Sequence, residues 1–355
     1  MHLLNNPYRG RGLPDLDHGG VWPSVDVGAV SALLARCPAF APTPLLRSRA
    51  LAARIGAGAF HIKDERTRMG LGSFKALGAA YAIAHDAMAT GSADLRTALG
   101  GRVYVAASAG NHGLSVAAGA RVFGARAVIY LARSVPEAFA QRLRAKGAEV
   151  ARAGDIYEES MAAAADVADS HGWTLLSDSS WRGYLDVPRR VMEGYLQMAA
   201  EAAEAIGRAP THIFLQAGVG GLAAAVAAHA RAVWGDAPLI AVVEPAFAPA
   251  LIESVRAGRM TRTDGPVSSM GRLDCKEPSL IALAGLARDA DVFVTIDEAE
   301  AADTVVMLSD LELATTPSGA AGIAGALGSS AHRDGLRLDG GSRILTFLSE
   351  GAEAP

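Results

Sequence analysis

The feature that most constrains the fold of this chain is a recurring order of secondary-structure patterns, without an internal sequence repeat. Several times a short β-rich run leads through a glycine-containing turn into an alanine-rich helical pattern. The strand-like runs cover residues 103–107, 127–131, 211–216, 239–243 and 343–348. Strands that alternate with helices need a mostly parallel sheet, because each crossover helix must pack against one of its faces. We therefore predict an α/β fold.

Two series of such strand–helix units are visible, one over roughly residues 77–187 and the other in the remainder of the 355-residue chain. A chain of this length is expected to form two domains or one large α/β unit. We predict two doubly wound lobes with mostly parallel sheets. Because ligands of such folds bind at the carboxyl ends of the strands, the loops after strands are where chemistry is expected.

The composition excludes several classes of protein. Hydrophobic residues make up 50% of the chain and charged residues 20%, which is typical of a globular protein. A net charge of −4 provides no electrostatic basis for binding nucleic acid or an anionic membrane. The most apolar run, residues 217–228, is too short to span a bilayer, and the N-terminal residues lack the apolar core of a signal peptide. With two cysteines, Cys37 and Cys275, no disulfide framework is predicted, so we expect a soluble cytoplasmic protein.

One lysine, Lys75, lies in a stretch built otherwise from small, apolar and single aromatic residues, GLGSFKALGAAYA at residues 70–82. A lysine on an apolar segment usually places its stem on the core and its ammonium in water. The alternative is an amine kept out of water for Schiff-base chemistry. The local sequence does not decide between the two.

The glycine-rich segment AGVGGLA, residues 217–223, follows a predicted strand and precedes a helix. Glycines let the backbone approach an anion, and the start of the helix presents free N–H groups, so a phosphate is the expected ligand. A tight turn without a ligand is the alternative. Gly218, Gly220 and Ala223 also satisfy the dinucleotide pattern, with Glu244 placed as a ribose-binding acid, so a nicotinamide dehydrogenase is a rival interpretation.

Three further segments follow strand-like runs. SAGNHG, residues 108–113, has glycines and a helix start that can bind a carboxylate, and His112 is either a general acid or a packed residue. Asp178 in DSSWRGY either points into a crevice or caps a helix or turn. Ser349 begins the segment SEG near the C-terminus.

In this order, the segments resemble the fold type II pyridoxal-phosphate enzymes, the tryptophan synthase β-like superfamily. The resemblance rests on KDE…GSFK (63–75), SAGNHG, GVGGLA, VEP (243–245) and SEG, and it runs from about residue 40 to the C-terminus. Two further blocks, DSSWRGY…VMEGY and MGRLDCKEPS (270–279), are similar to the diaminopropionate ammonia-lyase family. The resemblance implies a large cofactor-binding domain of residues 1–76 and 188–355, a small domain of residues 77–187, and an active site in the cleft between them.

The resemblance also implies a role for each matched residue. Lys75 forms the Schiff base with pyridoxal 5'-phosphate, Asn111 meets its phenolic oxygen, and Ser349 faces its pyridine nitrogen. The phosphate is held by Gly218, Val219, Gly220, Gly221 and Leu222, and the substrate carboxylate by the turn of Ser108, Ala109, Gly110 and His112. Asp178 is the catalytic base. No metal site is predicted.

The implied reaction is a β-elimination of an amino acid, with L-2,3-diaminopropionate as the expected substrate, in a homodimer. In this family one aspartate is associated with each enantiomer, and the aspartate for the D-isomer is replaced here by Ala109. The aspartate for the L-isomer corresponds to Asp178, so we expect a preference for the L-isomer. A serine/threonine or 3-hydroxyaspartate dehydratase is the alternative within the fold. Arg182, where the family leads us to expect an acidic residue, either accepts a second carboxylate or is a surface charge.

Overall fold

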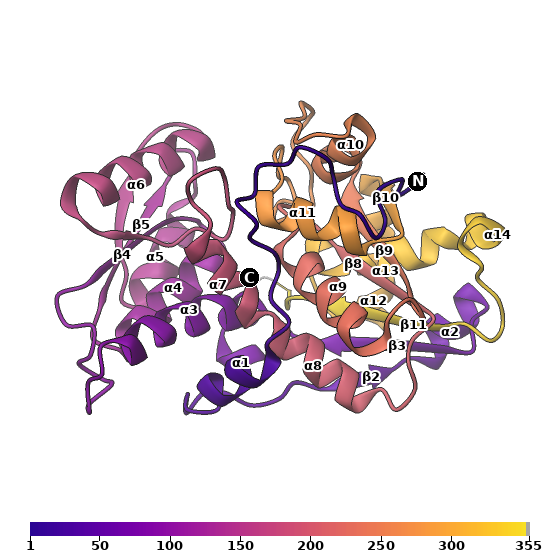
Figure 1. The fold of residues 1–355 in the computed structure, drawn as a ribbon, viewed down its shortest axis with the longest axis horizontal. Coiled ribbons are helices and arrows are strands. Elements are labelled where there is room, and N and C mark those ends of the chain that lie inside the picture. The colour runs from indigo at the N-terminus through magenta and orange to yellow at the C-terminus, as the bar shows by residue number, and fades with distance from the viewer. Residues whose placement is uncertain (353–355) are drawn as a thin grey trace.

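The larger of two lobes is built on a seven-stranded sheet. In this computed structural model, which describes residues 1–352, the larger lobe lies on the right of Figure 1. In spatial order its strands are β1 (His2–Asn5), β10 (Val292–Ile296), β9 (Leu239–Pro245), β8 (His212–Gln216), β11 (Arg343–Leu348), β3 (Ala59–Asp64) and β2 (Leu45–Arg47). The central strands are parallel, and the edge strands β1 and β2 are antiparallel to their neighbours.

The smaller lobe, on the left of Figure 1, contains a sheet of four parallel strands. In spatial order these are β6 (Glu149–Arg152), β5 (Arg126–Leu131), β4 (Val103–Ala107) and β7 (Thr174–Leu175). The two sheets confirm the predicted α/β class with mostly parallel strands. The strands expected at 103–107 and 343–348 coincide with β4 and β11, and the other expected strands end within two residues of those observed.

Helices cover both faces of both sheets. They are α1 (Val27–Leu34), α2 (Arg49–Ile55), α3 (Lys75–Ala89), α4 (Asn111–Val122), α5 (Glu137–Ala145), α6 (Tyr157–His171), α7 (Asp186–Gly194), α8 (Leu196–Ala205), α9 (Gly221–Trp234), α10 (Ala250–Ala257), α11 (Leu280–Asp289), α12 (Glu298–Asp310), α13 (Pro317–Gly328) and α14 (Arg333–Leu336), with 3₁₀ turns η1 (Arg68–Gly70) and η2 (Ser329–His332). Within the described residues, none of these helices has the length and apolar character needed to cross a membrane.

Alternate strand residues divide the interior of the larger lobe into two cores, because successive side chains of a strand point to opposite faces. Ile213 and Leu215 of β8 pack with α8, α9 and α11. Phe214 between them faces the other core, which α13, α12 and α2 complete. Because both faces of the sheet are covered, β8 and β9 are buried along their whole length. Their polar side chains lie at or next to the strand ends.

The chain passes between the lobes through two packed helices. The expected boundaries, at residues 76/77 and 187/188, fall within the first turns of α3 and α7, and these helices pack against each other. The strands of the four-stranded sheet come from residues inside 77–187 and those of the larger sheet from outside it. The boundaries themselves stay a prediction.

A network of buried charges anchors the segment that leads to Lys75. Glu201 of α8 accepts hydrogen bonds from Lys63 Nζ at 2.5 Å and from Arg68 Nη2 at 2.6 Å, and Arg68 Nε also donates to Glu65 at 2.7 Å. Lys63, Glu65 and Arg68 are completely buried. Such charges persist in an interior only when they are paired and hydrogen-bonded, so the network fixes η1 against α8.

We predict that Glu201→Ala destabilises the protein by about 3–5 kcal/mol, because it leaves two buried cations, Lys63 and Arg68, with the single carboxylate of Glu65. The free energy of unfolding, measured by urea titration and followed by circular dichroism, checks this. Glu137→Ala is the matched control, since Glu137 pairs with Arg144 and Arg152 on the surface and its loss should change little. Equal stability of Glu201→Ala and the parent protein would contradict the assigned network.

Candidate active site

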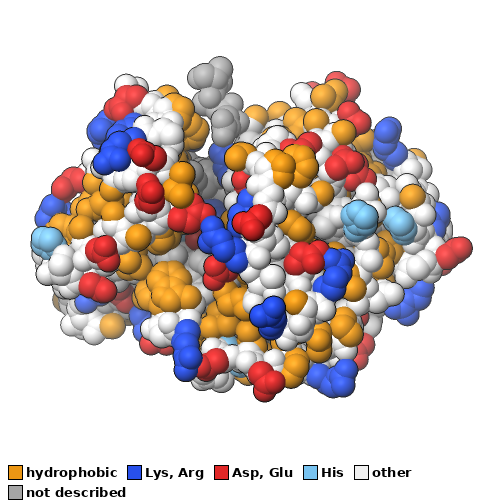
Figure 2. Space-filling view, turned by 90° about the horizontal axis from the view of Figure 1, so that it is seen from above, with side chains coloured by type: hydrophobic (Ala, Val, Ile, Leu, Met, Phe, Trp, Pro, Cys, Tyr) orange, Lys and Arg blue, Asp and Glu red, His pale blue; other side chains and the backbone are white. Residues whose placement is uncertain are grey.

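The predicted site residues meet between the two lobes. Lys75 is the first residue of α3, and its Nζ donates a hydrogen bond to Asp178, which follows β7 of the smaller lobe. Asn111, the first residue of α4, donates to Glu350, which follows β11 of the larger lobe. Figure 2 shows the molecule hollowed between the lobes on the face it displays. The structure therefore brings together the lysine, the asparagine loop, the aspartate and the C-terminal segment.

The Lys75–Asp178 ion pair controls the protonation of both groups. Burial acts to lower the pKa of the Lys75 amine, but the Asp178 carboxylate, with a further contribution from Tyr195, raises it above its ordinary value. Burial acts to raise the pKa of Asp178, yet the Lys75 ammonium holds it well below the usual range. A raised pKa would help Asp178 to act as a general base, because a base works best with a pKa near the working pH. The structure shows the opposite while Lys75 carries its charge, because the ammonium lies in direct contact with the carboxylate.

Two aromatic rings enclose the lysine side chain. The Lys75 ammonium lies 5.2 Å from the ring centroid of Phe74 and 5.8 Å from that of Tyr195, and the two rings pack at 4.8 Å. The Tyr195 ring lies against Gly78, one turn along α3, where a Cβ would come within 2.6 Å of it. Lys75 is thus held by packing and charge, and the interpretation as a solvated surface lysine is wrong.

The side chain of His112 is packed. Its Nε2 lies 2.8 Å from the Leu176 carbonyl oxygen, which only accepts, so Nε2 carries the proton. Burial lowers the pKa of His112, which keeps the ring neutral. The hydrogen bond ties α4 to the loop two residues before Asp178. The turn at Ser108–Gly110 precedes α4, whose start has no side-chain cap, so its backbone N–H groups are available for an anion.

The glycine loop between β8 and α9 has the geometry of an anion cradle. Gly220 has a φ of +100°, which only glycine adopts readily, and no side chain caps the start of α9 at Gly221. A Cβ at Gly218 would lie 2.9 Å from Cys275 Sγ and 3.0 Å from Leu273 Cα. The loop therefore requires glycine at Gly218 and Gly220, and the N-terminus of α9 leaves donors for a phosphate.

Two residues with alternative interpretations are resolved by their contacts. The Glu244 carboxylate is buried and accepts the backbone N–H groups of Leu251 and Ile252 at 2.7 and 2.8 Å, and burial raises its pKa to about 8. It is bound at the start of α10, so it is not presented to a ribose, and the dehydrogenase interpretation loses its acidic residue. Arg182 is 85% exposed and pairs with Asp17 at 3.0 Å, which makes it a surface charge.

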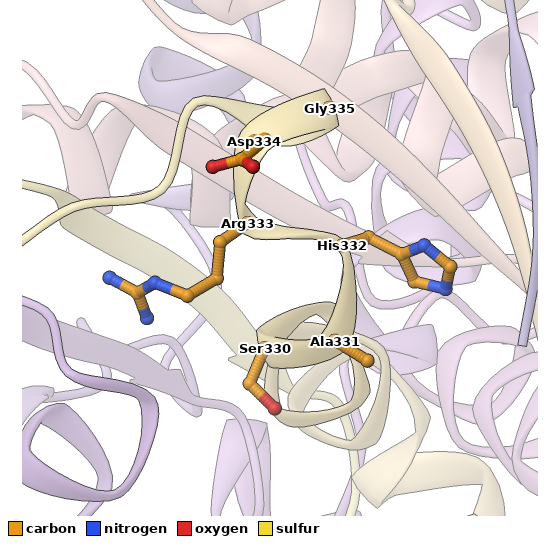
Figure 3. Close-up of a pocket in the computed structure, with 6 residues that line it drawn as sticks. All are labelled: Ser330, Ala331, His332, Arg333, Asp334 and Gly335. Atoms are coloured by element: carbon orange, nitrogen blue, oxygen red, sulfur yellow. The ribbon is translucent and has the colours of Figure 1, made fainter.

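A cavity of about 420 Å³ lies elsewhere in the larger lobe, around η2 and α14. Figure 3 shows its lining, which is Ser330, Ala331, His332, Arg333, Asp334 and Gly335. Arg333 there donates to the backbone carbonyl of Ile55. None of the predicted site residues lines this cavity.

The lobes and the site at their junction define a fold type II pyridoxal-phosphate enzyme. The protein family described as "Pyridoxal-phosphate dependent enzyme" matches residues 37–350. A diaminopropionate ammonia-lyase from Salmonella typhimurium is 30% identical to this chain, over 92% of the chain and 89% of that protein. One from Escherichia coli K12 is 32% identical, over 80% and 76% respectively.

Solved structures give the same relationship. The Escherichia coli diaminopropionate ammonia lyase in complex with D-serine superposes with a TM-score of 0.89 at 26% identity, covering 99% of this chain and 93% of that one. The same enzyme with an aminoacrylate-PLP azomethine reaction intermediate gives 0.87 at 27% identity, with the same coverage. This chain belongs to the family of pyridoxal-phosphate dependent enzymes, with pyridoxal phosphate as its cofactor, and it is close to diaminopropionate ammonia-lyase.

The residues at the site fit this cofactor. The Tyr195 hydroxyl is buried beside the Lys75 ammonium, which only donates, so the hydroxyl proton has no acceptor among the described residues. An unsatisfied buried polar group costs about 1–3 kcal/mol. Burial raises the pKa of Tyr195 to about 12, so the phenol remains a donor near neutral pH. Its ring lies beside Gly221, where a Cβ would be 3.5 Å away. An anionic ligand would accept hydrogen bonds from this hydroxyl and from the free backbone N–H groups at the start of α9.

Several residues at the site were not predicted from the sequence. They are Tyr195, Arg272, Cys275 and Glu350, which surround Lys75, Asp178 and the two glycine-containing loops. Burial raises the pKa of the Cys275 thiol to about 12, so this cysteine is a neutral neighbour of the site. Glu350 lies within the quoted segment SEG, and its position after a strand was the available signal. Tyr195 lies between two helices, and its place at the end of the quoted block VMEGY was the available signal.

We predict that Gly218→Ala weakens pyridoxal phosphate binding at least about 10-fold, because its Cβ would force the loop away from the backbone at Leu273. Titration of the cofactor-free protein, followed by tryptophan fluorescence, measures this. Gly335→Ala serves as the control, since a Cβ there meets nothing within 4 Å. Unaltered affinity in Gly218→Ala would show that the loop tolerates a side chain.

Proposed function

We propose that this enzyme catalyses the β-elimination of L-2,3-diaminopropionate, giving pyruvate and two molecules of ammonia with the uptake of one water. The observation that carries the proposal is the contact between Lys75 and Asp178 in the cleft. It pairs the lysine expected to bind the cofactor with the one aspartate expected to act on an L-amino acid. The relatives that bear the name diaminopropionate ammonia-lyase support the choice of substrate.

The residues proposed to hold the cofactor come from both lobes. Lys75 would bind it covalently, the loop Gly218–Leu222 and the start of α9 would bind its phosphate, Asn111 would donate to its phenolic oxygen, and Ser349 would contact its pyridine nitrogen. When bound, pyridoxal phosphate withdraws electrons from the α-carbon and makes the α-hydrogen acidic. A neutral hydroxyl at Ser349 would leave the bound ring a weaker electron acceptor than a carboxylate would, which suits a β-elimination.

Asp178 and Lys75 are proposed to move the protons. The substrate carboxylate binds the backbone of the turn Ser108–His112, which orients the α-hydrogen toward Asp178. Asp178 accepts that proton, and the Lys75 amine or a water donates a proton to the departing β-amino group. Burial is the largest influence on the pKa of Asp178 and acts to raise it. Once the Lys75 nitrogen is no longer an adjacent ammonium, the pKa of Asp178 therefore rises toward the range of a general base.

The proposed preference for the L-isomer rests on the presence of a base on only one face of the bound substrate. The α-hydrogens of the two enantiomers lie on opposite faces when the other substituents are held in the same places. Asp178 serves one face, and the methyl group of Ala109 stands where the family carries the second aspartate and cannot accept a proton.

We predict that Asp178→Asn keeps the cofactor bound but lowers turnover of L-2,3-diaminopropionate at least about 100-fold, because a general base typically contributes that much or more. Pyruvate release measures turnover, and the visible absorbance band measures the bound cofactor. Lys75→Ala is the companion variant. It should lose both turnover and the modification that borohydride otherwise fixes on the Lys75 peptide, detected by mass spectrometry. Normal turnover in Asp178→Asn would remove Asp178 from the role of base.

We predict that the D-isomer of 2,3-diaminopropionate releases pyruvate at least about 100-fold more slowly than the L-isomer, since its α-hydrogen faces Ala109. Steady-state rates with each pure enantiomer test this. L-serine and L-threonine are assayed alongside, because a dehydratase of the same fold would prefer them. Equal rates for both enantiomers would contradict the stereochemical proposal, and faster turnover of L-serine or L-threonine would favour the dehydratase.

The assembly is a proposal from the family resemblance, and the location is a proposal from the two cysteines, which form no disulfide framework. We propose a homodimer that works in the cytoplasm on a small amino-acid substrate.

A further inference from the structure

Glu350 is a buried carboxylate at the cleft that the proposed reaction does not use. It follows Ser349 at the end of β11, and only 4% of its side chain is exposed. A carboxylate at this depth is stable only when its oxygens are paired with donors or a cation. The identity of those partners therefore indicates what the residue does.

Its partners come from three separate parts of the chain. Glu350 Oε2 accepts a hydrogen bond from Asn111 Nδ2 of the smaller lobe and pairs with Arg272 Nε at 3.0 Å. Glu350 Oε1 accepts from Thr316 Oγ1, the N-cap residue of α13. One carboxylate thus links α4 of the smaller lobe to two segments of the larger lobe.

The backbone of the same segment is joined to the loop before Lys75. Glu350 and Ser73 form an antiparallel bridge, Phe74 N donates to Ser349 O at 3.0 Å, and Gly351 N donates to Gly72 O at 3.0 Å. The backbone of this segment therefore fixes the residues that immediately precede Lys75. At the same time, the side chain of Glu350 contacts Asn111.

The surrounding structure makes room for this side chain. A Cβ at Gly319 would lie 3.1 Å from Glu350 Cγ and 2.2 Å from Thr315 Oγ1, so a larger residue there would displace the glutamate. Thr315 Oγ1 itself donates to the Glu350 carbonyl oxygen at 2.5 Å. Gly319 and Thr315, at and just before the start of α13, therefore form the space that the Glu350 side chain occupies.

We propose that Glu350 is a positioning residue of the cofactor site, which acts by fixing the side-chain amide of Asn111. Asn111 Nδ2 carries two hydrogens, and Glu350 accepts one of them. This sets the rotamer and the flip of the amide, and it leaves the second N–H to be donated to an oxygen of the cofactor. The inference rests on the proposed contact between Asn111 and the cofactor, and it does not depend on which amino acid is the substrate.

The test is a double-mutant cycle of Glu350 and Asn111, read out by cofactor binding. The variants are Glu350→Gln, which keeps the shape and removes the charge, Glu350→Asp, which keeps the charge and shortens the reach, Asn111→Ala, and each Glu350 variant combined with Asn111→Ala. The affinity of the cofactor-free proteins for pyridoxal phosphate is measured by fluorescence titration. The pH midpoint of the visible band of the loaded proteins is the second readout, because a general loss of stability would not move it.

Each Glu350 variant is expected to weaken pyridoxal phosphate binding roughly 10-fold, the size of a lost charge-assisted hydrogen bond. Combined with Asn111→Ala, it should weaken binding no further, and the pH midpoint should shift in the same direction in all of these variants. Wild-type affinity in both Glu350 variants would overturn the proposal. So would losses that multiply in the double variants, since Glu350 would then act independently of Asn111.

Glu298→Gln is the matched control. Its carboxylate accepts from Ser268 Oγ at 2.7 Å and from Ser269 N at 2.6 Å, and it lies in the same lobe at the start of α12. It shares no contact with Asn111 or Lys75, so its pyridoxal phosphate affinity should equal that of the parent protein.

Discussion

The contact between the Lys75 ammonium and the Asp178 carboxylate is the interaction on which the site depends. It joins residues 103 positions apart and places two opposite charges in a partly buried site between the lobes. Burial opposes the charge on each group, so each is ionised because the other is. This coupling makes the pair a switch: a change in the bonding of the lysine nitrogen changes the basicity of the aspartate.

Around this pair, the fold supplies rigid supports from both lobes. The buried charges of Lys63, Arg68 and Glu201 fix the turn before Lys75, and His112 holds the carbonyl of Leu176 before Asp178. Parallel strands buried on both faces leave their carboxyl ends as the places where polar groups gather. The side chains at this junction are therefore held in fixed positions by contacts from both lobes.

Much of the fold could be predicted, because parallel strands buried on both faces read as apolar runs with glycine at their ends. The strands β4, β8 and β11 were found in this way. Others were missed for identifiable reasons: β3 carries charged residues that belong to the buried network, and β1 is a short edge strand. Among residues that follow strands, the sequence indicated Asn111, Asp178 and Ser349 but not Glu350, and it did not indicate Tyr195, which lies between two helices.

By itself, the sequence determined the class of fold, the cofactor through its resemblance to a family, and the residue types that each loop offers, including alanine at Ala109. Those depend on local patterns, because periodicity and glycine placement are written along the chain. Only the tertiary structure decided that Lys75 pairs with Asp178, that Arg182 lies on the surface, and that Glu350 meets Asn111. Burial and pairing depend on segments far apart in the chain, and no local pattern encodes which of them meet.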